Sequence, residues 1–269
     1  MTPEGDELIK IDASVAHSAR VYDYLLGGKD NFAADREAGD QMIAALPNVV
    51  SGSRMNRAFL ARAVRYLVAD CGIRQFLDIG TGIPSAGNTH EVAQAIAPQT
   101  RVVYVDNDPI VLAHARALLI GTPEGLVDYL HTDLRDPEQI LSAAARTLDF
   151  SQPIALMMLM VLHMIPDADS PHAIVGRLLS ALPHGSYLAV SHPPSDILAE
   201  NVAEVQQRFN ERLGSGQSMT ARSRDEVARF FRGLELVPPG VVQVHEWRPD
   251  GRLDPDAPAS IWCAVGHKK

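Results

Sequence analysis

Three aspartates follow short apolar segments of the chain, and a glycine-rich turn accompanies the first of them. Asp78 lies in the stretch 76–84 (FLDIGTGIP), where an apolar run leads into a turn with two glycines. Asp106 ends the apolar run in 103–108, and Asp133 lies just past the end of a third run, in the stretch 132–136 (TDLRD). Because the carboxyl ends of parallel strands meet in one crevice, we expect the three carboxylates to line a single ligand site.

The spacing of these residues indicates a nucleoside. Gly80 and Gly82 let a ligand approach the backbone closely, although such a pair alone is equally typical of a plain tight turn. Asp106 lies 24 positions after Gly82 (106 minus 82), near the offset of about 20 residues at which an acid reaches the hydroxyls of a ribose. Asp133 stands where a carboxylate can accept a hydrogen bond from an adenine amine. Together the three positions predict a nucleoside site.

Two further observations separate the classes of nucleoside cofactor. A dinucleotide site has a third glycine or alanine three residues after the second, so that the start of the helix can hold a pyrophosphate, and here Ser85 takes that place. Asp78 would repel a pyrophosphate but would hold the ammonium group of S-adenosylmethionine (SAM). We therefore expect SAM as the cofactor and keep an NAD-dependent oxidoreductase as an alternative. The expected cofactor-binding residues are Asp78, Gly80, Thr81, Gly82, Asp106, Asn107, Asp133, Leu134 and His163.

Two histidines follow later strands and are the candidates for catalysis. His163 comes after the fourth apolar run and His192 after the fifth, where both would face the same crevice. Methyl transfer from a sulfonium needs positioning rather than a protein nucleophile, and a base helps only where the acceptor must lose a proton. Either histidine could instead pack or hydrogen-bond within a loop. The residues predict a SAM-dependent methyltransferase with a small-molecule acceptor; the alternative is a catalytically silent SAM-binding sensor or interaction protein.

The string 27–31 (GGKDN) places a cation, an anion and an amide directly after two glycines. A turn in which Asn31 caps the next helix explains part of this string. We also consider a lid over the cofactor pocket, in which Lys29 or Asn31 reaches the cofactor or the acceptor and Tyr22 lines the wall. No spacing of His, Asp and Glu makes a convincing metal site, so we expect no metal.

Three helices, followed by alternating strands and helices, are expected to carry these residues. The first three helices are expected to begin at the caps Asp12 and Asn31 and after the pair 51–52. From residue 75 onward, continuous apolar runs suit strands buried on both faces of a parallel sheet. The expected strands cover residues 75–79, 102–105, 126–130, 154–160 and 187–190.

The helices between these strands have clear start signals. Caps before a proline are expected at Asp108, Asp136 and Ser170, and Asn88 with Glu91 forms a capping box. These signals and the strands predict an α/β fold, with a doubly wound, mostly parallel, seven-stranded sheet and a helical N-terminal cap.

The last third of the chain completes this fold. An amphipathic helix is expected over 196–213, where it could wall the acceptor site or form the face of a homodimer. Ser223 with Glu226 opens a last helix. The segments 241–247 and 260–265 have no helix between them and should pair as a hairpin.

Residues 75–193 resemble the class I SAM-dependent methyltransferase fold, with its DxGxG motif at 78–82. The string 19–32 (ARVYDYLLGGKDNF) and the ending 247–249 (WRP) extend the resemblance over nearly the whole chain. They are similar to an actinobacterial family of S-adenosyl methyltransferases once catalogued as a domain of unknown function. The resemblance implies SAM binding and carries no established acceptor. Pro84 departs from the general class, in which many members have a third glycine, so the shape of the turn after the motif stays open.

We expect one methyltransferase domain over 1–269 with four parts. These parts are a helical cap and lid (1–73), a nucleoside-binding core (74–193), a helical insertion (194–222) and a last helix with a C-terminal hairpin (223–269).

Composition excludes several other classes of protein. With 269 residues, 46% of them apolar, the chain is long enough to bury a full core. A net charge of -9 without a basic run argues against binding to nucleic acid. The longest apolar run is too short to span a bilayer, and the start of the chain lacks the order of a signal peptide. Only two cysteines are present, so we expect a cytoplasmic protein without disulfides or contact with a membrane.

Overall fold

One mixed sheet forms the centre of the structure, a computed structural model that describes residues 12–118, 121–211, 218–251 and 260–269. The strand order is β3-β2-β1-β4-β5-β8-β6, and β7 pairs with β8. Strands β1 to β5 run parallel to one another, whereas β8 runs antiparallel to β5, β6 and β7. The strands are β1 (Gln75–Ile79), β2 (Arg101–Asp106), β3 (Leu126–His131), β4 (Ala155–Leu159), β5 (Tyr187–His192), β6 (Glu235–Leu236), β7 (Val242–Gln243) and β8 (Trp262–His267).

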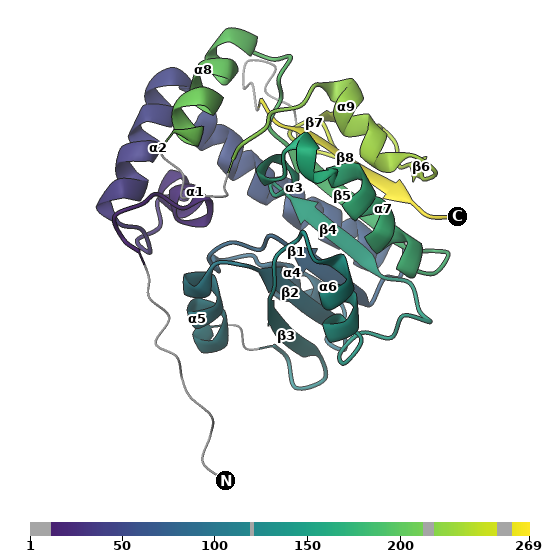
Figure 1. Cartoon of the computed structure of the whole chain (residues 1–269). Coiled ribbons are helices and arrows are strands. Elements are labelled where there is room, and N and C mark those ends of the chain that lie inside the picture. The colour runs from purple at the N-terminus through teal and green to yellow at the C-terminus, as the bar shows by residue number, and fades with distance from the viewer. Residues whose placement is uncertain (1–11, 119–120, 212–217, 252–259) are drawn as a thin grey trace.

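Helices cover both faces of this sheet (Figure 1). Apolar residues of α3 and α4 form one buried layer with the sheet, and residues of α6, α7 and α9 form the layer on its other face. The helices are α1 (Ser18–Leu26), α2 (Ala33–Ala45), α3 (Val49–Ala69), α4 (Thr89–Ile96), α5 (Pro109–Leu118), α6 (Pro137–Ala144), α7 (Pro171–Ala181), α8 (Ala199–Asn210) and α9 (Arg224–Ala228). The predicted doubly wound α/β fold is confirmed, with two short strands, β6 and β7, at its antiparallel edge.

The alternation of side chains along β1 decides where its carboxylate points. Leu77 and Ile79 belong to the layer with α6 and α7, whereas Phe76 packs with α3 and α4. Asp78 shares the face of Phe76, because every second residue of a strand points to the same side. The carboxylate therefore lies toward the start of α4. The strand order reverses between β1 and β4, which makes this edge the expected ligand crevice.

A third apolar cluster joins α1, α2 and α8, the three helices grouped at one end of the molecule in Figure 1. Val21 and Leu25 of α1 and Val205 and Phe209 of α8 are buried in it, together with Met219. Helix α3 links this cap to the sheet, since it begins beside α1 and runs beneath the central strands. We call α1, α2, α8 and the first turns of α3 the cap.

The structure corrects the predicted starts of the first two helices. Helix α1 does not begin at Asp12, because His17 is its N-cap. Helix α2 does not begin at Asn31; Phe32 is the N-cap, and its N–H donates to Asp35 at 2.8 Å. In both cases the true start is set by a side chain that also serves a tertiary contact, which local spacing does not reveal.

Three further boundaries differ from the prediction for backbone reasons. Helix α3 starts at Val49 and continues through the expected start at 51–52. Helix α8 starts at Ala199 rather than 196 because Leu198 has a left-handed conformation with φ 52°; the predicted end at 213 lies outside the described residues. Ser170 also has positive φ, 53°, and its side chain does not cap α7.

The remaining predictions about secondary structure hold closely. The five parallel strands begin and end within two residues of their predicted limits. The capping signals of α4, α6 and α9 are all used, as is the capping side chain of Asp108, whose Oδ1 accepts from Ile110 N at 2.8 Å. The predicted C-terminal hairpin is present only as the two-residue pairing of β7 with β8, and β6 is an additional strand.

Candidate functional site

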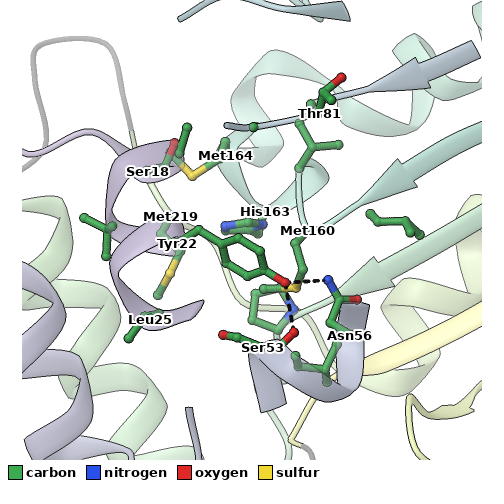
Figure 2. Close-up of a pocket in the computed structure, with 18 of the residues that line it drawn as sticks. Ser18, Tyr22, Leu25, Ser53, Asn56, Thr81, Met160, His163, Met164 and Met219 are labelled. Carbon is green, nitrogen blue, oxygen red and sulfur yellow. Dashed lines mark hydrogen bonds between the residues drawn. The ribbon is translucent and has the colours of Figure 1, made fainter. Parts of the chain in front are cut away.

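A cavity of about 230 Å³ lies between the carboxyl ends of the parallel strands and the cap. Most of the predicted site residues line it, from the strand ends and from α1. Those brought together are Tyr22, Asp78, Gly80, Thr81, Gly82, Asp106, Asn107, Asp133, Leu134 and His163. Lys29, Asn31 and His192 are not among the described residues of the lining. Figure 2 shows the part of the cavity that Tyr22 and His163 line.

Backbone conformation and close packing both explain the glycines of the turn at 80–82. Gly80 and Gly82 have φ of 75° and 67°, which favour glycine strongly. A Cβ atom at Gly80 would lie 2.2 Å from Cγ2 of Val161, so this position also requires the close approach of the segment after β4. Nothing lies within 4 Å of a Cβ built at Gly82, which leaves open space there. The turn therefore shapes the cavity wall and is more than a plain connection.

Asp106 holds this turn against the end of β2. Its Oδ2 accepts a hydrogen bond from Gly82 N at 2.8 Å, and its Oδ1 accepts from Asp108 N at 2.9 Å. Burial raises the pKa of the Asp106 carboxyl, and the two backbone N–H groups oppose this shift. Each carboxylate oxygen retains a second lone pair, so the group can still accept from the hydroxyls of a ribose.

Asp78 is 6% exposed and accepts a hydrogen bond from the hydroxyl of Thr89 at 2.6 Å. Burial raises the pKa of Asp78 to about 6, against the lowering effects of the Thr89 hydrogen bond and the charge of Arg57. A cation placed beside Asp78 would lower the free-energy cost of burying its negative charge. The site therefore suits the ammonium group that the sequence pattern predicts here.

Arg57 of α3 is a cavity residue that the sequence analysis missed. Its Nη2 donates to Ala86 O at 3.2 Å and to Asn88 Oδ1 at 3.4 Å, both long contacts. The guanidinium thus lies in the same wall as Asp78 with donor capacity to spare. An acid and a base in one wall match the two charges of an α-amino acid.

Asp133 and Leu134 line the far end of the cavity, beyond β3. Asn107 donates to Asp133 Oδ2 at 3.0 Å, and Arg135 N donates to Oδ1 at 2.8 Å. Leu134 is 5% exposed and gives this end an apolar surface. A carboxylate beside an apolar side chain fits a purine ring with an exocyclic amine.

The two candidate histidines occupy different environments. His163 lines the cavity at 8% exposure, and its Nδ1 has no hydrogen-bond partner among the described residues. Burial, together with the charge of Arg222, lowers the pKa of His163 to about 4, so the ring is neutral near pH 7. It is therefore able to accept a proton or a hydrogen bond.

His192 does not face the cavity, contrary to the expectation for both histidines. Its side chain is fully buried, with Nδ1 2.9 Å from Pro193 O and Nε2 3.0 Å from Nη1 of Arg222. Because a carbonyl oxygen only accepts and a guanidinium only donates, Nδ1 carries the proton. Strand β5 extends through His192 and pairs it with Trp262, which explains why its side chain stays inside the fold.

The string 27–31 forms the turn between α1 and α2. Asn31 Nδ2 donates to Asp23 Oδ2 at 2.9 Å and to Gly28 O at 3.0 Å. A Cβ atom at Gly28 would overlap the carboxylate of Asp23, which explains the second glycine. Lys29 is exposed. The idea that Lys29 or Asn31 reaches a ligand stays a prediction, and these contacts account for Asn31 without one.

Tyr22 connects α1 with α3 at the cavity wall. Its hydroxyl donates to Ser53 O at 3.2 Å and accepts from Asn56 Nδ2 at 2.9 Å, as Figure 2 shows. The Nδ1 atom of His17 lies 2.9 Å from Oδ2 of Asp108 and so ties the cap to the end of β2. These contacts fix the cap over the strand ends.

The ending 247–249 has a structural role in the described part of the chain. Trp247 is fully buried, with its ring centroid 5.3 Å from Phe59 and 5.8 Å from Tyr66. Arg62 donates to Trp247 O at 2.9 Å, and the guanidinium of Arg248 lies 3.9 Å from the centre of the Tyr66 ring. The motif thus anchors the segment before β8 on α3.

Comparison with known proteins decides the family. The model of a family described as S-adenosyl methyltransferase matches residues 4–269. The chain belongs to this family of S-adenosyl methyltransferases. Its members use SAM as the methyl donor, so the cavity with its three strand-end aspartates lies in a SAM-dependent methyltransferase.

Solved structures agree with this family. A DUF574 family protein from Streptomyces avermitilis is 46% identical, with a TM-score of 0.92; the match covers 97% of this chain and 100% of that one. A candidate methyltransferase from Thermobifida fusca is 41% identical, with a TM-score of 0.87 and 96% of each chain covered. A SAM-dependent methyltransferase from Anabaena variabilis shares the fold at 14% identity and a TM-score of 0.51, over 77% of this chain and 84% of that one. No curated protein matches this methyltransferase.

No group of three or more His, Cys, Asp or Glu side chains in the described ranges could hold a metal ion. None of the helices in those ranges is long and apolar enough to cross a membrane.

Proposed function

We propose that this methyltransferase binds SAM along the ends of β1, β2 and β3 and methylates a small molecule held beneath the cap. The observation that carries the proposal is one continuous cavity: its acidic end lies at the strand ends, and its apolar end lies under α1, α2 and α8. Helix α8 contributes Val202, Val205 and Phe209 to this lining and therefore walls the acceptor end. Whether the enzyme also forms a homodimer is a separate expectation.

The residues at the strand ends suit the parts of SAM in order. Asp78 would hold the ammonium group, and Arg57 would hold the carboxylate of the same amino acid. The turn from Gly80 to Gly82 would contact the cofactor through its backbone. The remaining acids would bind the nucleoside, with Asp106 at the ribose and Asp133 at the adenine. This assignment rests on the positions of the groups in one wall and on their charges.

When bound, SAM supplies a methyl group on a sulfonium whose thioether is already a good leaving group. The chain's own contribution is therefore to orient the acceptor, to exclude water and to take a proton. His163 is the residue placed for the last task, because it is neutral, lines the cavity and has an unpartnered ring nitrogen. The apolar space beside His163 favours an enzyme over a silent SAM sensor, which would need no such space.

A small, uncharged acceptor fits the rest of the molecule better than a macromolecule. The net charge of -9 opposes nucleic acid, and the cap covers the cavity with three helices. Cys71 and Cys263 are free thiols, which supports a place in the reducing cytoplasm.

Calorimetric titration with SAM, S-adenosylhomocysteine and NADH tests the proposal. We expect both SAM and S-adenosylhomocysteine to bind in the micromolar range and NADH not to bind. Asp106→Ala should abolish the binding of both, whereas Asp70→Ala, at an exposed acid of α3's C-cap, should not change it. A melting curve of each variant confirms folding. Failure of folded wild-type protein to bind SAM would overturn the proposed function.

A further inference from the structure

The end of the cavity under the cap, which we call the acceptor half, differs sharply from the strand-end half in chemistry. It is walled by apolar side chains of the cap and of the segments after β4 and α8. Leading examples are Leu25, Met42, Met160, Val205, Phe209 and Met219. The aspartates and arginines among the described lining residues all belong to the strand-end half; they are Arg57, Asp78, Asp106, Asp133 and Arg135. A charged acceptor would find no counter-charge in the acceptor half.

Two buried polar groups in this wall lack partners among the described residues. Asn56 is 4% exposed, and its Oδ1 has no hydrogen bond. His163 is 8% exposed, and its Nδ1 has none. An unsatisfied buried polar group costs about 1–3 kcal/mol, so a ligand that supplies hydrogen bonds would recover this free energy. Both groups therefore point to an acceptor with proton-bearing heteroatoms.

The orientation of the Asn56 amide is fixed by its neighbours. The hydroxyl of Tyr22 donates its single proton to Ser53 O, so it can only accept from Asn56. The amide nitrogen Nδ2 must then face Tyr22, as it does at 2.9 Å, and the oxygen is left over. Asn56 thus keeps a buried acceptor oxygen without a partner in the wall of the cavity. Figure 2 shows this arrangement, with Tyr22 bridging Ser53 and Asn56.

Methionines are concentrated in the same wall. Four of the eight methionines of the chain line the cavity, and Met160, Met164 and Met219 appear together in Figure 2. The stretch 154–162 is thus divided: Met157 and Met158 are core residues, whereas Met160 reaches the cavity. Thioethers are polarisable and make favourable contacts with aromatic rings, so this wall favours a flat aromatic ligand.

We propose that the acceptor half takes an uncharged aromatic molecule with a phenolic hydroxyl that reaches His163 and a second O–H or N–H that donates to Asn56 Oδ1. This inference rests on the proposed function and names the class of its acceptor. Tyr22 is a positioning residue here, because it orients the Asn56 amide.

The transfer step balances with the groups in place. A lone pair of the phenolic oxygen forms the new O–C bond while the S–C bond of SAM breaks, and the bonding pair goes to sulfur to give S-adenosylhomocysteine. The hydroxyl proton passes to the neutral ring of His163 and then to solvent. A phenol suits this step better than an aliphatic alcohol, because its proton is far more acidic.

Binding of simple naphthalene probes to the S-adenosylhomocysteine complex tests the proposal. The probes are naphthalene, 2-naphthol, 2-naphthoate and the set of dihydroxynaphthalene isomers, titrated into full-length protein saturated with S-adenosylhomocysteine. We expect 2-naphthol to bind more tightly than naphthalene and at least tenfold more tightly than 2-naphthoate. At least one dihydroxynaphthalene isomer should bind about three to ten times more tightly than 2-naphthol, the gain expected for one further hydrogen bond.

Asn56→Leu assigns that gain to a residue. The variant should lower the affinity of the best isomer to that of 2-naphthol, while 2-naphthol and S-adenosylhomocysteine bind within twofold of wild type. Asn201→Leu, at an exposed position of α8 outside the described lining, is the matched control and should change none of these values. A merely structural role of Asn56 would weaken all probes equally and would overturn the proposal.

Other outcomes separate the acceptor class from the proposed function. Tight binding of 2-naphthoate, or no gain from a second hydroxyl, would overturn the acceptor class. The same holds if no probe binds while S-adenosylhomocysteine does, and the proposed function then stands. Failure of S-adenosylhomocysteine itself to bind would instead overturn the proposed function.

Discussion

Arg222 donates an N–H to Nε2 of His192 across 3.0 Å, and the same buried guanidinium holds the segment that carries His163. It donates to Leu162 O at 3.0 Å and to Ile165 O at 2.8 Å, on either side of that histidine. Its charge also contributes to the lowered pKa of His163. One arginine thus fixes the position of the candidate base and adds to the effect of burial in lowering its pKa, without touching it.

Arg222→Leu should destabilise the protein by about 3 kcal/mol or more, because it leaves two carbonyl groups and His192 without their buried donor. Urea denaturation measures this loss. Arg229→Leu, at an exposed arginine on the same stretch, serves as the control and should cost less than about 0.5 kcal/mol. Equal effects of the two substitutions would contradict the role given to Arg222.

Asp78→Asn should stabilise the protein without ligand and weaken SAM binding. The folded pKa of about 6 lies above the ordinary 3.8, so the ionised carboxylate costs stability as the pH rises through about 6. At pH 7.5 the neutral amide should raise the free energy of unfolding by roughly 2 to 3 kcal/mol. Affinity for SAM should fall at least tenfold. Urea denaturation and calorimetry at pH 7.5 measure the two effects.

The pH dependence of SAM binding provides the control for Asp78. In the wild type, affinity should fall as the pH drops below about 6, where Asp78 becomes protonated. Asp78→Asn should remove most of this pH dependence. A small part should remain because the pKa of Asp106 is also raised. An unchanged pH profile in the variant would show that the ammonium group binds elsewhere.

Arg57→Gln should weaken SAM binding about 10-fold or more, because a charged hydrogen bond to the carboxylate is lost. Methylthioadenosine lacks the amino acid part of SAM, so its affinity should stay within twofold. Arg54→Gln, at an exposed arginine one turn earlier on α3, is the matched control. If Arg57→Gln weakens both ligands equally, the arginine acts on the fold and not on the carboxylate.

His163→Gln should make the protein less sensitive to acid. A neutral buried histidine with a folded pKa of about 4 contributes stability that is present above its unfolded value of 6.5 and is lost as the pH falls toward 4. Between pH 6.5 and 4.5 the wild type should lose about 2 kcal/mol more than the variant. NMR titration of the ring should show His163 neutral at pH 5. A ring charged at pH 6 would contradict this environment.

Gly80→Ala should destabilise the protein more than Gly82→Ala. Both substitutions place a Cβ on a residue with positive φ, at a cost of about 1–2 kcal/mol each. Only Gly80→Ala also collides with Val161. Adding Val161→Ala to Gly80→Ala should therefore recover part of the loss, whereas adding it to Gly82→Ala should not. Urea denaturation of the four variants forms the test.

The parallel strands and their acids could be predicted because both signals are local. Strands β1, β2, β4 and β5 are buried along nearly their whole length, as their apolar runs predict. Strand β3 is only partly buried, contrary to that prediction, because it lies at the edge of the sheet. A carboxylate at or just past the end of such a strand still reaches the crevice. Asp78, Asp106 and Asp133 accordingly all line the cavity. The two histidines carried the same local signal, yet only one faces the site. Strand β4 ends four residues before His163, whereas β5 continues through His192. Strand β5 extends that far because it pairs with β8 up to Trp262.

The helices of the cap could be predicted, but the cap residues that line the cavity or contact the strand ends could not. Arg57 and Asn56 lie on the long helix α3. The spacing of its apolar residues predicts the face that packs on the sheet and does not predict which polar residues line the cavity. The fold brings Asp108 beside His17, although the two residues lie far apart in the sequence. Partners distant in sequence decide such roles.

The lining of the cavity divides along the chain as well as in space. Most of the nucleoside end comes from one contiguous stretch, 78–135, whereas the apolar end is assembled from 17–60 and from residues after 159. Substitutions that reshape the apolar end therefore need not disturb the stretch that reads the nucleoside. Relatives could exchange one methyl-accepting compound for another while inheriting their donor chemistry intact, and a library confined to the two outer stretches would explore that same diversity in the laboratory.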